Sequence, residues 1–335
     1  MPANLLPIMK KFLFVLAVLA LISCDDKPNK RVLTRSSGGL NNLTVVMPNE
    51  LWQGQIGETI RQKLAGTVEG LPQIEPLFDI NQMPKEAFTG FMRKQRTFLE
   101  IEKANDTSIK ILTNPYAKPQ TGIVLKGPDE AAISALIKRD SAKIVSTFKA
   151  TEVKEKQRRI NISLKEDEKL KKNFGISLKF PSAYRYAKTD KDFFWIRKDL
   201  KSGDMDITVY QVPLSVIDKD TNTIAAIIKM RDSISGDGIL TDEGTRFRTE
   251  PSYAPYLKTT TIDGHKAWET KGTWDIDGRF MAGPFVNYAI RDEKHDRYLV
   301  LEGFVFKPSV GKRDNMFELE SILKSVSFID EDKNK

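Results

Sequence analysis

Residues 259–274 read TTTIDGHKAWETKGTW, and this stretch decides the type of fold in the second half of the chain. The runs on either side of Asp263-Gly264 are rich in β-branched and aromatic residues, which favour strands. An Asp-Gly pair between two such runs is a strong signal for a tight hairpin turn. The stretch therefore predicts two antiparallel strands, 259–262 and 265–274, that pair with each other.

The sequence on both sides of this hairpin extends the strand pattern. Ile176, Leu178 and Phe180 alternate with polar residues, which predicts a half-buried strand. Further strands are predicted over 193–198, 206–212, 285–291, 297–306 and 327–329. Only two helices are predicted in this half, over 222–233 and 315–325. Runs of strands with few helices indicate an α+β architecture.

The first half shows the same combination of predicted strands and helices. The β-branched run 43–47 predicts a strand, and apolar residues spaced along 51–64 predict a helix with one buried face. Strands are predicted over 98–102, 108–113 and 123–125, followed by a helix over 129–148. We therefore expect an α+β protein of two halves, each a mainly antiparallel sheet with helices packed on one face.

The charged segment 149–173 marks the boundary between the halves. Its run KEKQRR at 154–159 predicts a solvated helix that continues the preceding one. We place a first α+β domain at 43–164, with this connecting helix at its end, and a second at 165–330. The chain length suits two ordinary domains. The polar stretch 24–42 is predicted to be a flexible tether.

The N-terminus carries the signature of a bacterial lipoprotein signal peptide, residues 1–23. Met9-Lys10-Lys11 is a basic start, and 12–22 are eleven apolar residues. A bilayer-spanning helix needs roughly 20 residues, so this run fits a secretory signal better than a short transmembrane helix. Met9 is the expected true start, because 1–8 carry no charge. Leu21-Ile22-Ser23-Cys24 then reads as a lipobox, with Cys24 as the lipid attachment site.

This signal predicts an envelope lipoprotein. Two acyl chains on Cys24, such as palmitate, give stable membrane anchoring, whereas one chain holds only marginally. An ordinary signal peptidase site is the alternative, but the small-residue A-x-A pattern is missing. We expect the mature chain outside the bacterial cytoplasm, anchored to the outer membrane, with the leaflet left open.

The composition of the chain limits the classes of partner that we expect. The formal charge of +8 falls to +6 when Lys10 and Lys11 leave with the signal peptide, a mildly basic balance. Cys24 is the only cysteine, so no disulfide can form within the chain. The basic run 154–159 has no interleaved aromatic residues, and acidic residues dilute it. Nucleic acid is therefore not an expected partner.

Catalytic and metal-binding motifs are missing. The chain has no G-x-S-x-G elbow, Walker A motif or G-x-G-x-x-G loop. Its two histidines, His265 and His295, fall at predicted turns, and we expect neither a metal nor a cofactor. The acidic pairs 204/206 and 275/277 are expected to be solvated strand residues. Tryptophans 195, 268 and 274 are expected in the core, rather than in a stacking platform.

Several elements of the first half resemble an uncharacterised, domain-of-unknown-function family of Bacteroidota lipoproteins. They are NNLTVVM at 41–47, LWQGQIG at 51–57, GLPQIEPLF at 70–78 and RKQR at 93–96. The resemblance covers most of the mature chain and is strongest over 36–126. It implies a lipid anchor and an envelope location. It implies no activity, so no catalytic residue is carried over.

The leading hypothesis is a non-enzymatic binding or adaptor module for an envelope protein or glycan partner. Loops as long and proline-rich as 66–96 are often functional. The candidate binding surface consists of residues in or beside this loop: Trp52, Glu75, Phe78, Phe91, Arg93 and Arg96.

Two alternatives remain open from the sequence. A carboxylate-dependent hydrolase of envelope polymers could use Glu69, Glu75 or Asp79 of the same loop. Such an enzyme would place two carboxyl groups roughly 5–10 Å apart across a cleft. A purely structural spacer would need neither a cleft nor a binding surface.

Overall fold

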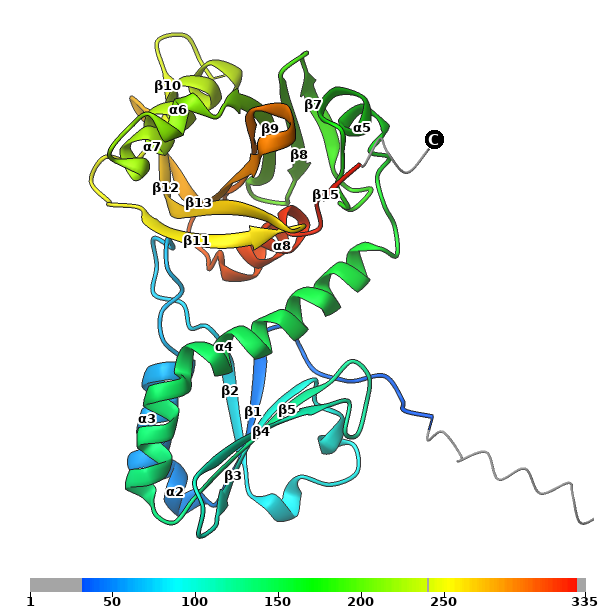
Figure 1. The fold of residues 1–335 in the computed structure, drawn as a ribbon, viewed down its shortest axis with the longest axis vertical. Coiled ribbons are helices and arrows are strands. Elements are labelled where there is room, and N and C mark those ends of the chain that lie inside the picture. The colour runs from blue at the N-terminus through cyan, green and yellow to red at the C-terminus, as the bar shows by residue number, and fades with distance from the viewer. Residues whose placement is uncertain (1–31, 240, 330–335) are drawn as a thin grey trace, which may run out of the picture.

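The structure is a computed structural model, and it describes residues 32–239 and 241–329. Two parts, each built on one large sheet, lie one above the other and are joined by the long helix α4 (Figure 1). The signal peptide 1–23 and Cys24 lie outside the described residues. None of the described helices is both long and apolar enough to cross a membrane.

The first sheet contains five strands in the order β2-β1-β3-β5-β4. Their bounds are β1 Asn42–Val46, β2 Asp79–Met83, β3 Thr97–Lys103, β4 Ser108–Thr113 and β5 Thr121–Gly127. The two-part α+β class is confirmed. Within this sheet, however, three pairings are parallel and only β4–β5 is antiparallel, where we expected mainly antiparallel strands. The long connections between β1, β2 and β3 permit this, because parallel strands need crossovers rather than tight turns.

Helices cover one face of the first sheet, as expected. The predicted helix over 51–64 is divided at Gly54 into α2, Asn49–Gln53, and α3, Gln55–Leu64. The helix α4, Glu130–Ile160, runs without interruption through the charged segment. Apolar side chains of α3 and α4 pack with β1, β3 and β5 into one core. Two short 3-10 turns, Lys85–Ala87 and Met92–Lys94, lie in the loop before β3.

The second sheet is antiparallel and larger. Its path is β10-β12-β13-β14-β9-β8-β7, with β11 paired beside β10 on the same side of β12. The strands are β7 Arg185–Thr189, β8 Phe193–Asp199, β9 Asp204–Pro213, β10 Arg246–Thr249, β11 Tyr256–Ile262, β12 His265–Asp277, β13 Arg279–Asp292 and β14 Arg297–Phe306. A separate pair joins β6, Ile176–Ser177, to β15, Ser327–Phe328. The hairpin predicted at Asp263-Gly264 is confirmed, with positive φ at both turn residues.

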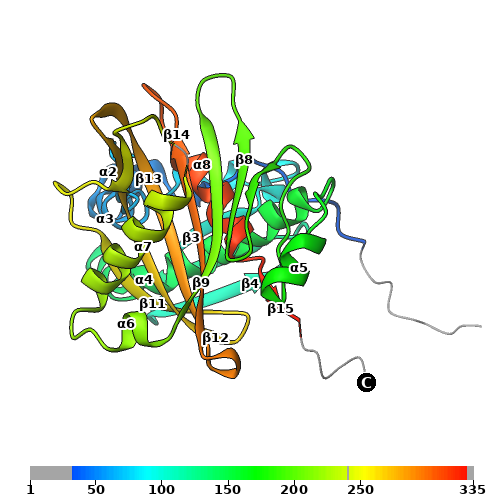
Figure 2. The same cartoon turned by 90° about the horizontal axis from the view of Figure 1, so that it is seen from above.

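Helices pack on both faces of the second sheet, which corrects the expectation of one covered face (Figure 2). On one face lie α5, Glu168–Phe174, and α8, Arg313–Leu323. The other face carries α6, Ser215–Asp218, and α7, Thr223–Gly238. Consecutive residues 285–290 of β13 are all buried, so this strand cannot follow the one-sided alternation that the expectation assumed.

A buried ion pair fixes α7 on the sheet. Arg231 of α7 and Glu302 of β14 are both fully buried, and their charged groups meet at 2.9 Å. The guanidinium also lies over the ring of Phe285, with 3.9 Å to the centroid. Asn287 donates a further hydrogen bond of 2.9 Å to the Glu302 carboxylate. This polar contact specifies one position of the helix within an otherwise apolar interface.

The two parts are joined by specific contacts as well as by α4. Lys156 of α4 forms an ion pair of 2.6 Å with Glu318 of α8, and Gln157 donates to the carbonyl of Ser321. From the first part, Glu75 accepts hydrogen bonds from the backbone N–H groups of Lys312 and Arg313 at the start of α8. The charged helix is therefore a packed junction, rather than a solvated connector.

The last part of the expected tether is also packed. Residues 34–37 exchange backbone hydrogen bonds with the segments around Gln95 and Lys118. Asn41 is fully buried, and its N–H donates to the carboxylate of Glu152 in α4. Residues 34–42 thus belong to the first domain, because this segment supplies hydrogen-bond partners that the domain needs. The rest of the predicted tether, 24–31, lies outside the described residues.

Candidate functional site

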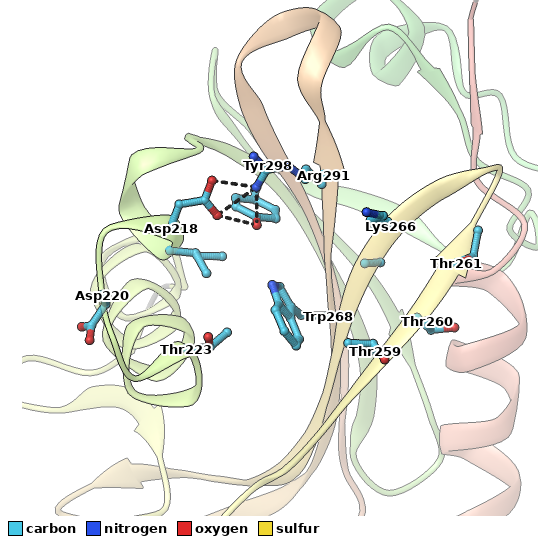
Figure 3. A pocket seen from close by; sticks show the side chains of 12 residues that line it. Asp218, Asp220, Thr223, Thr259, Thr260, Thr261, Lys266, Trp268, Arg291 and Tyr298 are labelled. Atoms are coloured by element: carbon cyan, nitrogen blue, oxygen red, sulfur yellow. Dashed lines mark hydrogen bonds and ion pairs between the residues drawn. The ribbon is translucent and has the colours of Figure 1, made fainter.

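An open cleft of about 780 Å³ lies in the second domain, between α6 and the β11–β12 hairpin (Figure 3). Its lining combines carboxylates, cations, hydroxyls and an indole. The polar and aromatic side chains are those of Asp218, Asp220, Thr223, Thr259, Thr260, Thr261, Lys266, Trp268, Arg291 and Tyr298. We take this cleft as the candidate ligand site.

The tight turn at Asp263-Gly264 builds one wall of the cleft. It sets a register in which Thr259 lies opposite Trp268, and Thr261 opposite Lys266. Side chains directly opposite each other in an antiparallel pair point to the same face of the sheet. The half-buried indole of Trp268 and the exposed ammonium of Lys266 therefore lie on the cleft side.

A closed hydrogen-bond network occupies one end of the cleft. Asp218 accepts two bonds from Nη1 of Arg291, at 2.6 and 2.9 Å, and one of 2.8 Å from the hydroxyl of Tyr298. The hydrogen bond with Asp218 raises the pKa of Arg291, so its positive charge is fixed. Burial, followed by the hydrogen bond to Asp218, raises the pKa of Tyr298. The phenol therefore remains protonated, and Arg291 and Asp218 neutralise each other.

The other charged groups of the cleft differ in how they are held. Asp220 accepts a hydrogen bond of 2.8 Å from the N–H of Asn222, the residue that caps α7. The side chain of Lys266 forms no ion pair or hydrogen bond with any other residue of 32–239 and 241–329. The ammonium of Lys266 is thus available to a ligand, whereas the positive charge of Arg291 is already matched by Asp218.

Two of the six residues of the predicted binding surface are buried, which corrects their assignment to a surface. Phe78 is fully buried, with its ring edge-on to that of Phe148. Arg96 is 2% exposed and forms a 2.7 Å ion pair with Glu152. The partner that permits this burial lies 56 residues along the chain. No local pattern around Arg96 could have indicated it.

The other four residues are not brought together. Glu75 lies at the junction with α8, and Trp52 lies half-buried under the guanidinium of Arg61, 4.8 Å from its ring centroid. Phe91 is 65% exposed, and the neighbouring Arg93 is exposed with its guanidinium over a tyrosine ring. Only Phe91 and Arg93 remain as a small surface pair. The six residues do not form one binding surface.

The carboxylates proposed for a hydrolase hold the two domains together. Glu69 pairs with Lys258 of β11, and Asp79 forms an ion pair of 2.8 Å with Arg313. The hydrogen bond from Arg313 lowers the pKa of Asp79. With Glu75 bound to the start of α8, all three groups already have partners in the second domain. None of the three lines the cleft between α6 and the β11–β12 hairpin.

The histidines and acidic pairs have structural surroundings. His265 stacks on Phe328, and His295 lies 2.7 Å from the carboxylate of Asp292. Within 32–239 and 241–329, no group of three or more His, Cys, Asp or Glu side chains could hold a metal ion. Asp206 is buried rather than solvated, and burial raises its pKa well above the ordinary value. It accepts a hydrogen bond of 2.7 Å from Nε1 of Trp195.

Sequence reasoning found one side of the cleft and missed the other. The Asp-Gly turn and Trp268 were visible as features of a hairpin, although we expected Trp268 in the core. Asp218, Arg291 and Tyr298 come from a short helix and two strands, and Asp218 and Arg291 lie 73 residues apart. No motif links them in the sequence. Their association depends on how α6 packs over β13 and β14.

Comparisons with known proteins identify each half with a family model of unknown function. Residues 36–161 match "Domain of unknown function (DUF8532)", and residues 163–325 match "Domain of unknown function (DUF4837)". No curated protein matches the chain.

The solved structures that match the chain are distant from it. The Ran-binding protein Mog1p of Saccharomyces cerevisiae is 9% identical, with a TM-score of 0.29, and the match covers 47% of this chain and 91% of that one. The PsbP protein CyanoP of Synechocystis sp. PCC 6803 is 9% identical, with a TM-score of 0.31, covering 50% and 92%. Likenesses of this size carry no argument about function.

Proposed function

We propose that the chain, whose two halves match families of unknown function, is a non-enzymatic binding or adaptor module. Its ligand site is the cleft between α6 and the β11–β12 hairpin, and its partner is a protein or a glycan. We further propose that Cys24 anchors it by lipid in the bacterial envelope, as the signal sequence predicts.

One observation carries the binding role: the cleft combines an accessible ammonium, an indole and a row of threonine hydroxyls in a preformed space. Sites for ligands are concave and mostly preformed, with a few polar groups that fix orientation. The acid at the end of this cleft, Asp218, is held by three hydrogen bonds from Arg291 and Tyr298. A carboxylate held in this way suits a fixed binding wall better than proton transfer.

The junction supports a role as a rigid presenting module. Glu75, Arg313 and Lys156 connect the domains through ion pairs and backbone hydrogen bonds. The described chain enters through the first domain, and the cleft lies in the second (Figure 1). An N-terminal anchor would therefore hold the first domain near the membrane and present the cleft at a distance from it.

Array binding tests this proposal. The purified protein without its signal peptide would be applied to arrays of envelope oligosaccharides and of short peptides, together with Trp268→Ala. Phe280→Ala is the matched control, because Phe280 is a fully exposed aromatic residue of β13. It lies about 30 Å from Trp268 along the paired strands β12 and β13. Thermal melts of all three proteins establish that each is folded.

Binding that is lost in Trp268→Ala and kept in Phe280→Ala supports the cleft as the ligand site. A ligand that binds both variants equally well would place the site elsewhere and overturn the assignment.

A further inference from the structure

We infer that the cleft takes an extended polypeptide segment, added as a strand to the free edge of β11, with an acidic side chain of that segment beside Lys266. The inference rests on the proposed function, since it names the class of ligand for the same cleft. It follows from three features of the structure: the main-chain groups of β11, the alternation of its side chains, and the charge of Lys266.

The first feature is an unpaired row of main-chain groups. β11 pairs with β12 on one side, and no described strand pairs with its other side. In a hairpin with a two-residue turn, the residues flanking the turn form a hydrogen-bonded pair, here Ile262 with His265. Pairs then alternate, so the N–H and C=O groups of Thr259 and Thr261 point away from β12. These are the groups to which an added strand would bind.

The free part of this edge is its end nearest the turn. At its start, Lys258 is held by Glu69 from the first domain. Thr259 and Thr261 are both exposed, and no backbone hydrogen bond other than those to β12 involves either residue in the described chain. The accessible edge is therefore short and lies directly at the cleft.

The second feature is the direction of the side chains. On an added strand, residues two apart would point to the cleft side. One would lie beside Thr259, in the row that includes Trp268, and the next beside Thr261, in the row that includes Lys266. Strand spacing places an added strand about 10 Å from β12, a gap that long side chains from both sides can bridge. The cleft thus selects an apolar residue and an acidic residue two positions apart.

The third feature is charge. Lys266 forms no ion pair within the described residues, whereas Arg291 is matched by Asp218. An acidic side chain is the complement of that one available ammonium. The free main-chain row favours a polypeptide over a glycan, because only another main chain can supply donors and acceptors in regular alternation. The half-buried indole of Trp268 offers less than a full face for stacking on a sugar ring.

The probe for this inference is a fluorescein-labelled heptapeptide, Ser-Val-Ser-Glu-Ser-Val-Ser, blocked at both ends. Its pattern is symmetrical, so either strand direction places glutamate beside Lys266 with valine two positions away. Two matched peptides accompany it: one with lysine in place of glutamate, and one with N-methylated amides on the edge-bonding side. Anisotropy gives the dissociation constants for the full mature chain without its lipid.

Three variants separate the contribution of the main-chain N–H groups from that of the Lys266 charge. Thr261→Pro removes an outward N–H while leaving the ladder to β12 intact, since proline is tolerated where an edge N–H faces solvent. Thr113→Val is its control, because Thr113 is an exposed threonine on β4, an edge strand of the first sheet that lies outside the cleft. Lys266→Glu reverses the charge. We expect Thr261→Pro to weaken binding of the glutamate peptide about tenfold, equivalent to about 1.4 kcal/mol.

The remaining expected results are equally specific. Thr113→Val binds the glutamate peptide like the native chain, and N-methylation of the peptide abolishes binding. Lys266→Glu shifts the preference from the glutamate peptide to the lysine peptide. Amide hydrogen exchange at Thr259 and Thr261 slows when the glutamate peptide is added.

Equal binding by Thr261→Pro and the native chain, or by the N-methylated and unmethylated peptides, would overturn the inference. If no peptide binds but an oligosaccharide binds in a manner that depends on Trp268, the proposed function stands and the polypeptide ligand is refuted. If neither class binds at the cleft, both proposals are refuted.

Discussion

Removing the carboxylate of Glu302 should strongly lower the stability of the second domain toward unfolding. Nε of Arg231 lies 3.0 and 2.9 Å from the two carboxylate oxygens, and Nη2 lies 2.9 Å from one of them. Both side chains are fully buried. Glu302→Leu would therefore leave a guanidinium inside the domain without its main counter-charge.

The magnitude follows from what remains around that guanidinium. Breaking a buried ion pair by removing one partner costs 3–5 kcal/mol as a typical range. Asp232 still lies 3.2 Å from Arg231, and the rings of Phe247 and Phe285 still flank it. We therefore expect the lower end, about 3 kcal/mol, for Glu302→Leu. The double variant with Arg231→Met removes both charges and should recover most of this loss.

Urea unfolding followed by tryptophan fluorescence measures the effect. Three of the four tryptophans lie in the second domain, so a Trp52→Phe background reports on that domain. Asp237→Asn is the matched control, because its pair with Arg246 is exposed and should contribute less than about 1 kcal/mol. A loss below about 1 kcal/mol for Glu302→Leu, or a double variant as unstable as the single one, would refute the reasoning.

The pH dependence gives an independent check. Burial raises the pKa of Glu302, and Arg231 opposes this shift. In Arg231→Met the opposition is gone, so the folded state holds the proton more tightly than the unfolded chain does. Stability from a raised carboxyl pKa is present at low pH and lost as pH rises. The destabilisation by Arg231→Met should therefore shrink between about pH 8 and about pH 5.

Four further predictions concern the cleft, the junction and the anchor. Asp218→Asn removes one negative charge beside Arg291, so affinity for the glutamate heptapeptide should rise in anisotropy titrations, and weaker binding would contradict this. Stability should change by less than about 1 kcal/mol. Glu75→Ala removes the acceptor at the start of α8, costing about 1 kcal/mol and accelerating amide exchange there but not in the second sheet. Burial lowers the pKa of Lys149 to about 8, so the native chain should gain stability relative to Lys149→Met as pH rises from about 8 to about 10 in urea titrations. Cys24→Ala should abolish metabolic palmitate labelling and detergent partitioning, and labelling that persists would exclude the predicted anchor.

Local patterns predicted most of the strands and helices. The Asp263-Gly264 turn gave a hairpin with its register, and apolar spacing gave the long helix α4 and the closing helix α8. These signals work because turn geometry and side-chain periodicity depend on residues close together in the chain. These local signals did not predict the relative direction of the strands in the first sheet. The choice between parallel and antiparallel pairing depends on how β1, β2 and β3 assemble, which no single segment specifies.

The main error was to assign buried residues to a surface. Arg96 and Phe78 looked like parts of one polar, proline-rich loop, yet both lie in the core of the first domain. A charged side chain is buried only when a partner is supplied, and Glu152 comes from a helix 56 residues away. Glu75 and Asp79 are not buried, but their partners also lie far along the chain, in the other domain.

The sequence alone determined the α+β class, the position of the hairpin, the single cysteine and the predicted N-terminal signal, because each is encoded in neighbouring residues. The tertiary structure alone decided which charges are paired, which strand edge stays open and where the cleft lies. Asp218, Arg291 and Tyr298 meet only because α6 packs over β13 and β14. Lys266 remains available because that packing supplies a partner to Arg291 and none to Lys266 among the described residues. Such pairings depend on distances across a folded sheet, and the order of residues along the chain does not contain them.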